Sequence, residues 1–124
     1  MTKKKTQTRE EYLQYQQEYR DSGGGKEVYR RWHLKRYYGI TTDQYDEMYA
    51  AQGGCCACCG LHQTEQKYRL DVDHEHGEVG IDAVRGLLCR GCNLAIGKLG
   101  DNIEGVQNAL DYLTAFYSGI NRGD

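Results

Sequence analysis

The chain has 124 residues, of which 39% are hydrophobic, so we expect one small domain with a modest core. It has no apolar run near the roughly 20 residues of a membrane span, and its polar N-terminus lacks the apolar segment of a signal peptide. We therefore expect a soluble, cytoplasmic protein without a membrane partner. In a reducing compartment, its six cysteines favour metal binding over disulfides.

The formal net charge of −2 conceals an uneven distribution. Residues 1–40 contain ten basic and five acidic side chains, whereas residues 41–124 contain six basic and thirteen acidic ones. We predict a basic N-terminal helical arm over 1–40 and a second domain over 41–124. This distribution fits a basic arm that contacts phosphates and an acidic domain whose carboxylates hold metal. A solvated basic helix explains the charges equally well.

Two helices are predicted in the arm. The first follows Arg9 and carries tyrosines at spacings of three and four, and glycines at 23–25 then break the chain. The second, over 26–38, interleaves aromatic and basic residues, a pattern that suits phosphates and unpaired bases but also a helix with its aromatics turned inward. We expect Trp32 in the core and expect four basic residues to contact DNA: Arg30, Arg31, Lys35 and Arg36.

Shorter elements are predicted in the second domain. A helix over 42–52 begins at Thr41 or Thr42, a strand ends at 74, a returning strand covers 83–89, and a short helix covers 93–98. A last helix runs from Ile103 to about Tyr117, where Asp101 and Glu104 resemble a capping box. Its apolar residues trace one face, which we expect to pack within its own chain, with a dimer seam as the alternative.

Two C-x-x-C pairs predict one closed, tetrahedral zinc site with a structural role. The first pair is ambiguous, because the segment CCACC contains two such pairs in different registers. A turn after the second cysteine favours a residue that tolerates positive φ, and Gly60 and Asn93 occupy the two corresponding positions. We therefore choose as ligands Cys56, Cys59, Cys89 and Cys92. Cys55 and Cys58 are then spare packing thiols, with a second metal or a redox role as the alternative.

A second group of polar residues lies between positions 70 and 93. Asp73 and His74 are at the predicted strand end, and Asn93 begins the helix that follows the second cysteine pair. If zinc pins this strand and helix together, a carboxylate and an amide oxygen form an incomplete shell suited to Mg²⁺. His74 can then take a proton from an attacking water.

These motifs carry a resemblance to a known family. The segments QGG-x-C-x-x-C-G, DHEH and VRGLLCRGCN, preceded by YGIT-x-x-x-Y, resemble the recombination endonuclease VII family of phages, within the His-Asn-His (ββα-metal) nucleases. The resemblance covers residues 38–101. It implies an α+β, mostly helical fold: a small zinc-stabilised ββα-metal core with an N-terminal helical arm and a C-terminal helix.

The resemblance also implies roles for individual residues. Asp73 and Asn93 would bind the catalytic divalent metal, Mg²⁺ or Mn²⁺, and His74 would be the general base. His76 would support the phosphate or metal, and Arg85 would contact the DNA backbone. The four chosen cysteines would bind structural Zn²⁺.

The sequence therefore predicts a metal-dependent DNA endonuclease of a phage, active in the host cytoplasm on branched or junction DNA in recombination, repair or packaging. Its expected partners are DNA, a second copy of the chain and other phage proteins. The alternative is a non-catalytic zinc module that binds nucleic acid or protein, which has no reason to keep Asp73, His74 and Asn93 together. A weaker third hypothesis is a redox or metal sensor that uses Cys55 and Cys58.

Overall fold

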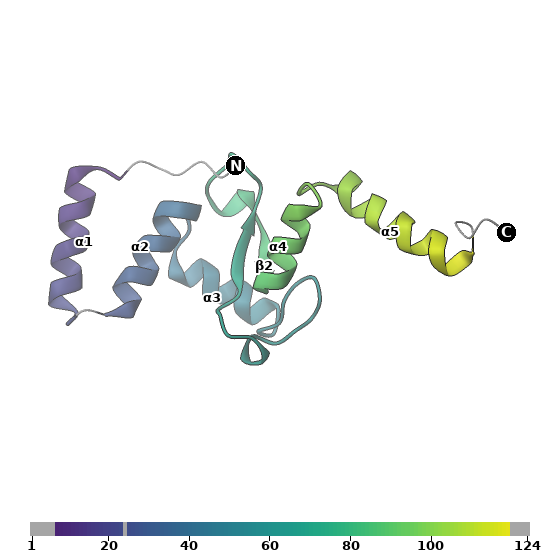
Figure 1. Cartoon of the computed structure of the whole chain (residues 1–124). Coiled ribbons are helices and arrows are strands. Elements are labelled where there is room, and N and C mark those ends of the chain that lie inside the picture. The colour runs from purple at the N-terminus through teal and green to yellow at the C-terminus, as the bar shows by residue number, and fades with distance from the viewer. Residues whose placement is uncertain (1–6, 24, 120–124) are drawn as a thin grey trace.

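The computed structural model describes residues 7–23 and 25–119. These residues form five α-helices, two short 3₁₀ turns and one two-stranded antiparallel sheet, which confirms the predicted α+β, mostly helical class (Figure 1). The elements in chain order are α1 (Arg9–Asp21), α2 (Lys26–Tyr38), α3 (Thr42–Ala51), η1 (Gln63–Glu65), β1 (Asp71–His74), η2 (Ile81–Ala83), β2 (Val84–Leu88), α4 (Arg90–Lys98) and α5 (Ile103–Ser118). Within these ranges, every helix is too short or too polar to cross a membrane.

The core lies between the end of α2, helix α3 and the β-hairpin. Its fully buried side chains include Ile40 and Leu87, and Tyr45 of α3 donates a 2.6 Å hydrogen bond to the Leu70 carbonyl just before β1. Leu34 of α2 is also buried there. The predicted domain boundary at residue 40 stays a prediction, and it falls at a point where α2 already contributes to the core.

Helix α1 lies at one end of the molecule and packs on α2 (Figure 1). The Trp32 ring of α2 meets Tyr15 of α1 edge-on at 6.0 Å, and its indole N–H donates a 3.0 Å hydrogen bond to Glu18. The expectation that Trp32 lies in the core is therefore wrong. This side chain is half-buried between the two helices, because the acidic partner of its N–H is on α1.

Side-chain alternation in the hairpin separates polar from apolar residues. Val72 and His74 are buried, whereas Asp71 and Asp73 point to the opposite, partly exposed face of β1. The connection to β2 is tied to the end of α2, where the Gly80 N–H donates a 2.7 Å hydrogen bond to the Tyr38 carbonyl. Gly39 allows this approach, because it has a φ of 69° and a Cβ there would lie 2.8 Å from the Gly80 nitrogen.

The Gln52 side chain fastens β2 to the cysteine loop. Its amide oxygen accepts a 3.0 Å hydrogen bond from the Leu87 N–H, and its amide nitrogen donates to the carbonyls of Leu87 at 2.9 Å and Cys55 at 2.8 Å. Gln52 therefore acts as a short substitute for a third strand at the free edge of β2.

Helix α4 begins earlier than predicted. It starts at Arg90 rather than Asn93, because Cys89 is its N-cap and the Cys89 sulfur accepts a hydrogen bond from the Cys92 N–H. Helix α5 also begins differently, since Asn102 rather than Asp101 caps it and accepts a 2.7 Å hydrogen bond from the Gly105 N–H.

The apolar face of α5 is exposed. Ile103 is 87% exposed, Leu110 56% and Tyr117 81%, and α5 extends away from the body at the end opposite α1 (Figure 1). The expectation that this face packs within its own chain is wrong. The dimer seam stays a prediction.

We predict that Gln52→Ala lowers the free energy of unfolding by about 1 to 3 kcal/mol, because it leaves the buried Leu87 N–H without its partner. Urea unfolding of the zinc-loaded protein, followed by circular dichroism, measures this change. The control is Gln107→Ala, which removes a hydrogen bond between exposed side chains on α5 and should change the stability by less than about 0.5 kcal/mol. Equal effects of the two substitutions would contradict the role of Gln52.

Candidate functional site

Four cysteines converge beneath the hairpin. The sulfur atoms of Cys56, Cys59, Cys89 and Cys92 all lie within 4.8 Å of one another, and they form the sole such metal-ligating cluster of His, Cys, Asp and Glu found among residues 7–23 and 25–119. One pair comes from the loop after α3 and the other from the junction of β2 with α4. These are the four cysteines chosen from the sequence, whereas Cys55 and Cys58 lie outside the cluster.

The local backbone favours the thiolate of one member of this cluster, Cys56. The N–H groups of Cys58 and Cys59 donate to the Cys56 sulfur at 3.4 and 3.5 Å. Burial raises the pKa of Cys56, but hydrogen bonds from the backbone of Cys59, Cys89 and Cys58 outweigh it and lower that pKa to about 6. Burial and the neighbouring thiols raise the pKa of Cys92. Four sulfur donors would complete a tetrahedral shell and leave no position open for water or substrate, which fits a structural zinc site.

The two cysteine pairs reach the cluster through different turns. Gly60 follows Cys59 with a φ of 80°, as predicted. Asn93 does not adopt the corresponding conformation, because it belongs to the first turns of α4, and Asp101 is the sole non-glycine residue with positive φ in the described part of the chain. The expectation of positive φ at Asn93 is therefore wrong.

Asp73 and Arg85 form a bidentate ion pair across the hairpin. The Arg85 Nε and Nη2 atoms donate to the two carboxylate oxygens of Asp73 at 2.8 and 2.7 Å, and Nη2 also donates to Asp101 at 2.6 Å. These hydrogen bonds raise the pKa of Arg85, and the one from Arg85 lowers the pKa of Asp101. His76 Nε2 lies 3.3 Å from the other Asp101 oxygen. Arg85 thus joins the strand to the segment between α4 and α5.

His74 is the one buried residue classed as polar or charged in the part of the chain that the structure describes, with 8% of its surface exposed. Its ring meets Tyr38 edge-on at 5.1 Å, and its Nε2 atom is buried without a hydrogen-bond partner. The Val72 backbone, by contrast, acts to raise the pKa of His74. Burial, followed by the nearby His76, outweighs this effect and lowers the pKa of His74, which favours the neutral ring.

Asn93 lies over the polar face of β1. Its amide nitrogen donates a 3.4 Å hydrogen bond to Asp71, which shares that face with Asp73 two positions along the strand. The cysteine cluster fixes this arrangement, because Cys92 immediately precedes Asn93 in α4. The structure thus places Asn93 over the face of β1 that carries Asp71 and Asp73, where Asp71 is its direct partner and Arg85 is that of Asp73.

The basic residues of α2 lie in different surroundings. Arg30 is paired with Asp46 at 2.9 Å and Glu27 at 3.7 Å, and Arg31 forms an ion pair with Glu18 of α1. Lys35 and Arg36 are exposed and lie over the rings of Trp32 and Tyr37. DNA contact by these four residues stays a prediction.

Sequence reasoning missed Asp71 and Asp101 as members of this network. The signal for Asp71 was present, because alternation in the strand places it on the face of Asp73. Asp101 was interpreted as a helix cap, and no pattern in the sequence indicates that the chain turns back there toward Arg85.

A β-hairpin, a following helix and a shared cysteine cluster define a small ββα unit. Residues 31–115 match the family described as recombination endonuclease VII, and the chain belongs to this family. It is 49% identical over 77 residues to "Gene 59 protein" of Mycobacterium phage D29 and 47% identical to "Gene 59 protein" of Mycobacterium phage L5. Each match covers 61% of this chain and 44% of the relative, so the chain spans less than half the length of these relatives. No solved structure matches the chain significantly.

We predict that the purified chain binds about one zinc ion, and that Cys56→Ser or Cys92→Ser abolishes stoichiometric binding because it removes one of four sulfur ligands. Metal analysis by mass spectrometry measures this directly. Cys55→Ser and Cys58→Ser are matched controls from the same loop and should retain the metal. Loss of zinc in Cys55→Ser, with retention in Cys56→Ser, would reverse the register of the first pair.

Proposed function

We propose that this protein is a metal-dependent DNA endonuclease, with its active site on the hairpin and α4. The observation that carries the proposal is the buried, unpartnered Nε2 of His74, in a neutral ring next to Asp73. An unpaired buried nitrogen costs free energy and is a common feature of groups that act on a ligand. Membership of the recombination endonuclease VII family supports the same chemistry.

The polar face of β1 suits a divalent metal. Asp73 offers a carboxylate, Asn93 offers an amide oxygen from α4, and both donors are of the hard oxygen type that Mg²⁺ and Mn²⁺ prefer. When bound there, the metal would act as a Lewis acid toward the scissile phosphate and its leaving oxygen. The neighbouring Asp71, which already accepts a hydrogen bond from Asn93, would hold that amide in place.

His74 would act as the general base. Its Nε2 accepts a proton from water as the water oxygen forms a bond to phosphorus, and the bond from phosphorus to the 3′-oxygen breaks. The leaving oxygen takes a proton from solvent, which gives 5′-phosphate and 3′-hydroxyl ends. The lowered pKa of His74 favours the neutral ring, the form that can accept this proton.

Arg85 would change partners during the reaction. In its present position it neutralises Asp73, the carboxylate that the metal needs, and Asp101 holds the same guanidinium from the other side. When Asp73 binds metal, Arg85 would stay anchored to Asp101 and would contact the DNA backbone. His76, which also contacts Asp101, would support this position.

DNA is the proposed partner, with branched or junction DNA as the favoured substrate, and a phage function in recombination, repair or packaging follows from the relatives. A homodimer through the exposed face of α5 and contacts with other phage proteins remain further predictions. The alternative is a zinc module that binds nucleic acid or protein without cutting it.

We predict that the wild type cuts a supercoiled plasmid and a synthetic four-way junction when Mg²⁺ is added, and that His74→Ala lowers the rate by at least about a hundredfold, since it removes the general base. Gel electrophoresis of the products measures cleavage, and end labelling identifies the 5′-phosphate.

The matched control is Glu78→Gln, an exposed carboxylate in the same hairpin, which should cut at the wild-type rate. Zinc content and circular dichroism establish that each variant is folded. If folded, zinc-loaded wild type is inert with every divalent metal, the endonuclease proposal fails and the binding-module alternative is favoured.

We predict that Arg85→Gln lowers the Mg²⁺ concentration for half-maximal cleavage by about threefold to tenfold, because the metal no longer competes with an ion pair worth about 1 kcal/mol. The maximal rate should also fall, because the phosphate contact is lost. A Mg²⁺ titration of plasmid cleavage separates the two effects. Arg20→Gln, on α1, is the control, and an unchanged Mg²⁺ requirement in Arg85→Gln would contradict the partner exchange.

A further inference from the structure

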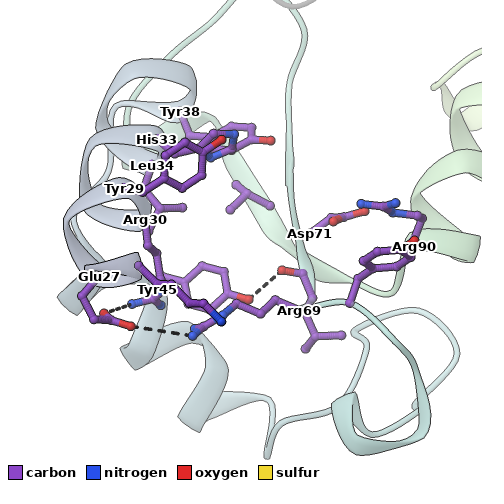
Figure 2. A pocket seen from close by; sticks show the side chains of 14 residues that line it. Glu27, Tyr29, Arg30, His33, Leu34, Tyr38, Tyr45, Arg69, Asp71 and Arg90 are labelled. Atoms are coloured by element: carbon purple, nitrogen blue, oxygen red, sulfur yellow. Dashed lines mark hydrogen bonds and ion pairs between the residues drawn. The ribbon is translucent and has the colours of Figure 1, made fainter. Parts of the chain in front are cut away.

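A cavity of about 420 Å³ lies between α2 and the segment that leads into β1 (Figure 2). Its base is apolar and rigid, because Leu34, Tyr45 and Val72 belong to the buried core. The cavity opens to solvent between the two walls. Its size is within the range of pockets that enclose a small organic ligand.

Flat side chains line both walls. Tyr29 projects from α2 and is 56% exposed, although its ring already meets His33 at 5.7 Å. On the opposite wall, the guanidinium of Arg90 stacks on the Tyr68 ring, with 3.7 Å between the guanidinium carbon and the ring centre. An aromatic ring and a guanidinium plane are the two groups on which unpaired bases stack in proteins.

The rim of the cavity is positively charged. Its cations outnumber its carboxylates, Glu27 and Asp71, even with Asp46, the partner of Arg30 at 2.9 Å, included. Glu27 is engaged at the bottom of the opening by Arg30 at 3.7 Å and Arg69 at 3.8 Å (Figure 2). The cations are Lys26, Arg30, Arg69 and Arg90. An apolar slot with a cationic rim is complementary to a flat base that carries an anionic phosphate.

The cavity borders the candidate active site through two of its lining residues, Tyr38 and Asp71. Tyr38, at its upper end in Figure 2, lies in ring contact with His74. Asp71, on the opposite wall, accepts the hydrogen bond from Asn93. A nucleotide in the cavity would therefore have its phosphate next to the residues proposed to cleave DNA.

We propose that this cavity binds one unpaired DNA base adjacent to the scissile phosphate, with the base held between Tyr29 and the stacked pair of Tyr68 and Arg90. A base inside a continuous duplex is stacked and paired, so it must leave the helix before it can enter. The cavity would thus select DNA with an unpaired nucleotide at the cleavage position. This inference rests on the proposed function for its substrate, but base binding is measurable without cleavage.

The test uses wild-type protein without added divalent metal. The probe is a DNA duplex with a single bulged 2-aminopurine, whose fluorescence falls when the base stacks, and the reference is the same sequence fully paired. We expect binding of the bulged duplex to be at least about fivefold tighter, the lower end of the contribution of one aromatic stack, and its emission to fall on binding. Tyr29→Leu and Tyr68→Leu should each weaken binding of the bulged duplex by a similar factor and leave the paired duplex unaffected.

The control is Tyr112→Leu, a 71% exposed tyrosine of α5 distant from the cavity, which should bind both duplexes as the wild type does. Equal binding of bulged and paired DNA, or unchanged binding of the bulged duplex by both cavity variants, would overturn the inference. The plasmid assay distinguishes failure of the base-binding inference from failure of the proposed function. Cleavage without preference for the bulge would support the nuclease proposal and reject base binding in the cavity. Preferential binding of the bulge without cleavage would support base binding and reject the nuclease proposal.

Discussion

The structure depends on four sulfur atoms held within 4.8 Å of one another. In such a cluster the thiols interact strongly, and here the backbone lowers the pKa of Cys56 while burial raises the pKa of Cys92. A bound cation would allow all four to ionise together and would make the cluster a main source of stability for a small core. The cluster joins the loop after α3 to the start of α4, and it thereby orients both the helix and the hairpin.

The candidate active site follows from that junction and from strand alternation. Cys92 fixes the first turns of α4, so the next residue, Asn93, must lie over β1. The two-residue repeat of β1 then directs Asp71 and Asp73 toward α4 and directs His74 toward Tyr38. The carboxylates consequently lie in a polar, partly exposed setting, while the imidazole is in a dry one that keeps it neutral. One short strand thus provides two different electrostatic environments to adjacent residues.

Local patterns predicted the elements well, and long-range packing explains the errors. The helix over 26–38 was predicted with its observed bounds, because glycines at both ends break the chain. The cysteine register was chosen from Gly60 and Asn93, of which only Gly60 has the expected positive φ. In contrast, periodicity correctly identified an apolar face on α5 but could not show whether anything covers it. The Arg85 interaction with Asp101 was invisible for a similar reason, since it depends on how α4 ends and turns back.

Helix α2 connects these parts of the molecule. One side of it holds α1 through Trp32 and Glu18, while another side forms a ladder of rings from Tyr29 through His33 to Tyr37. Acidic neighbours partly neutralise its cations on the α1 and α3 sides, where Arg31 meets Glu18 and Arg30 meets Asp46. The remaining positive charge is therefore concentrated at the rim of the cavity and along the exposed side with Lys35 and Arg36. If the proposed function holds, a DNA strand that follows this charge would pass from α2 along the cavity toward His74, and the basic arm and the hairpin would form one binding surface.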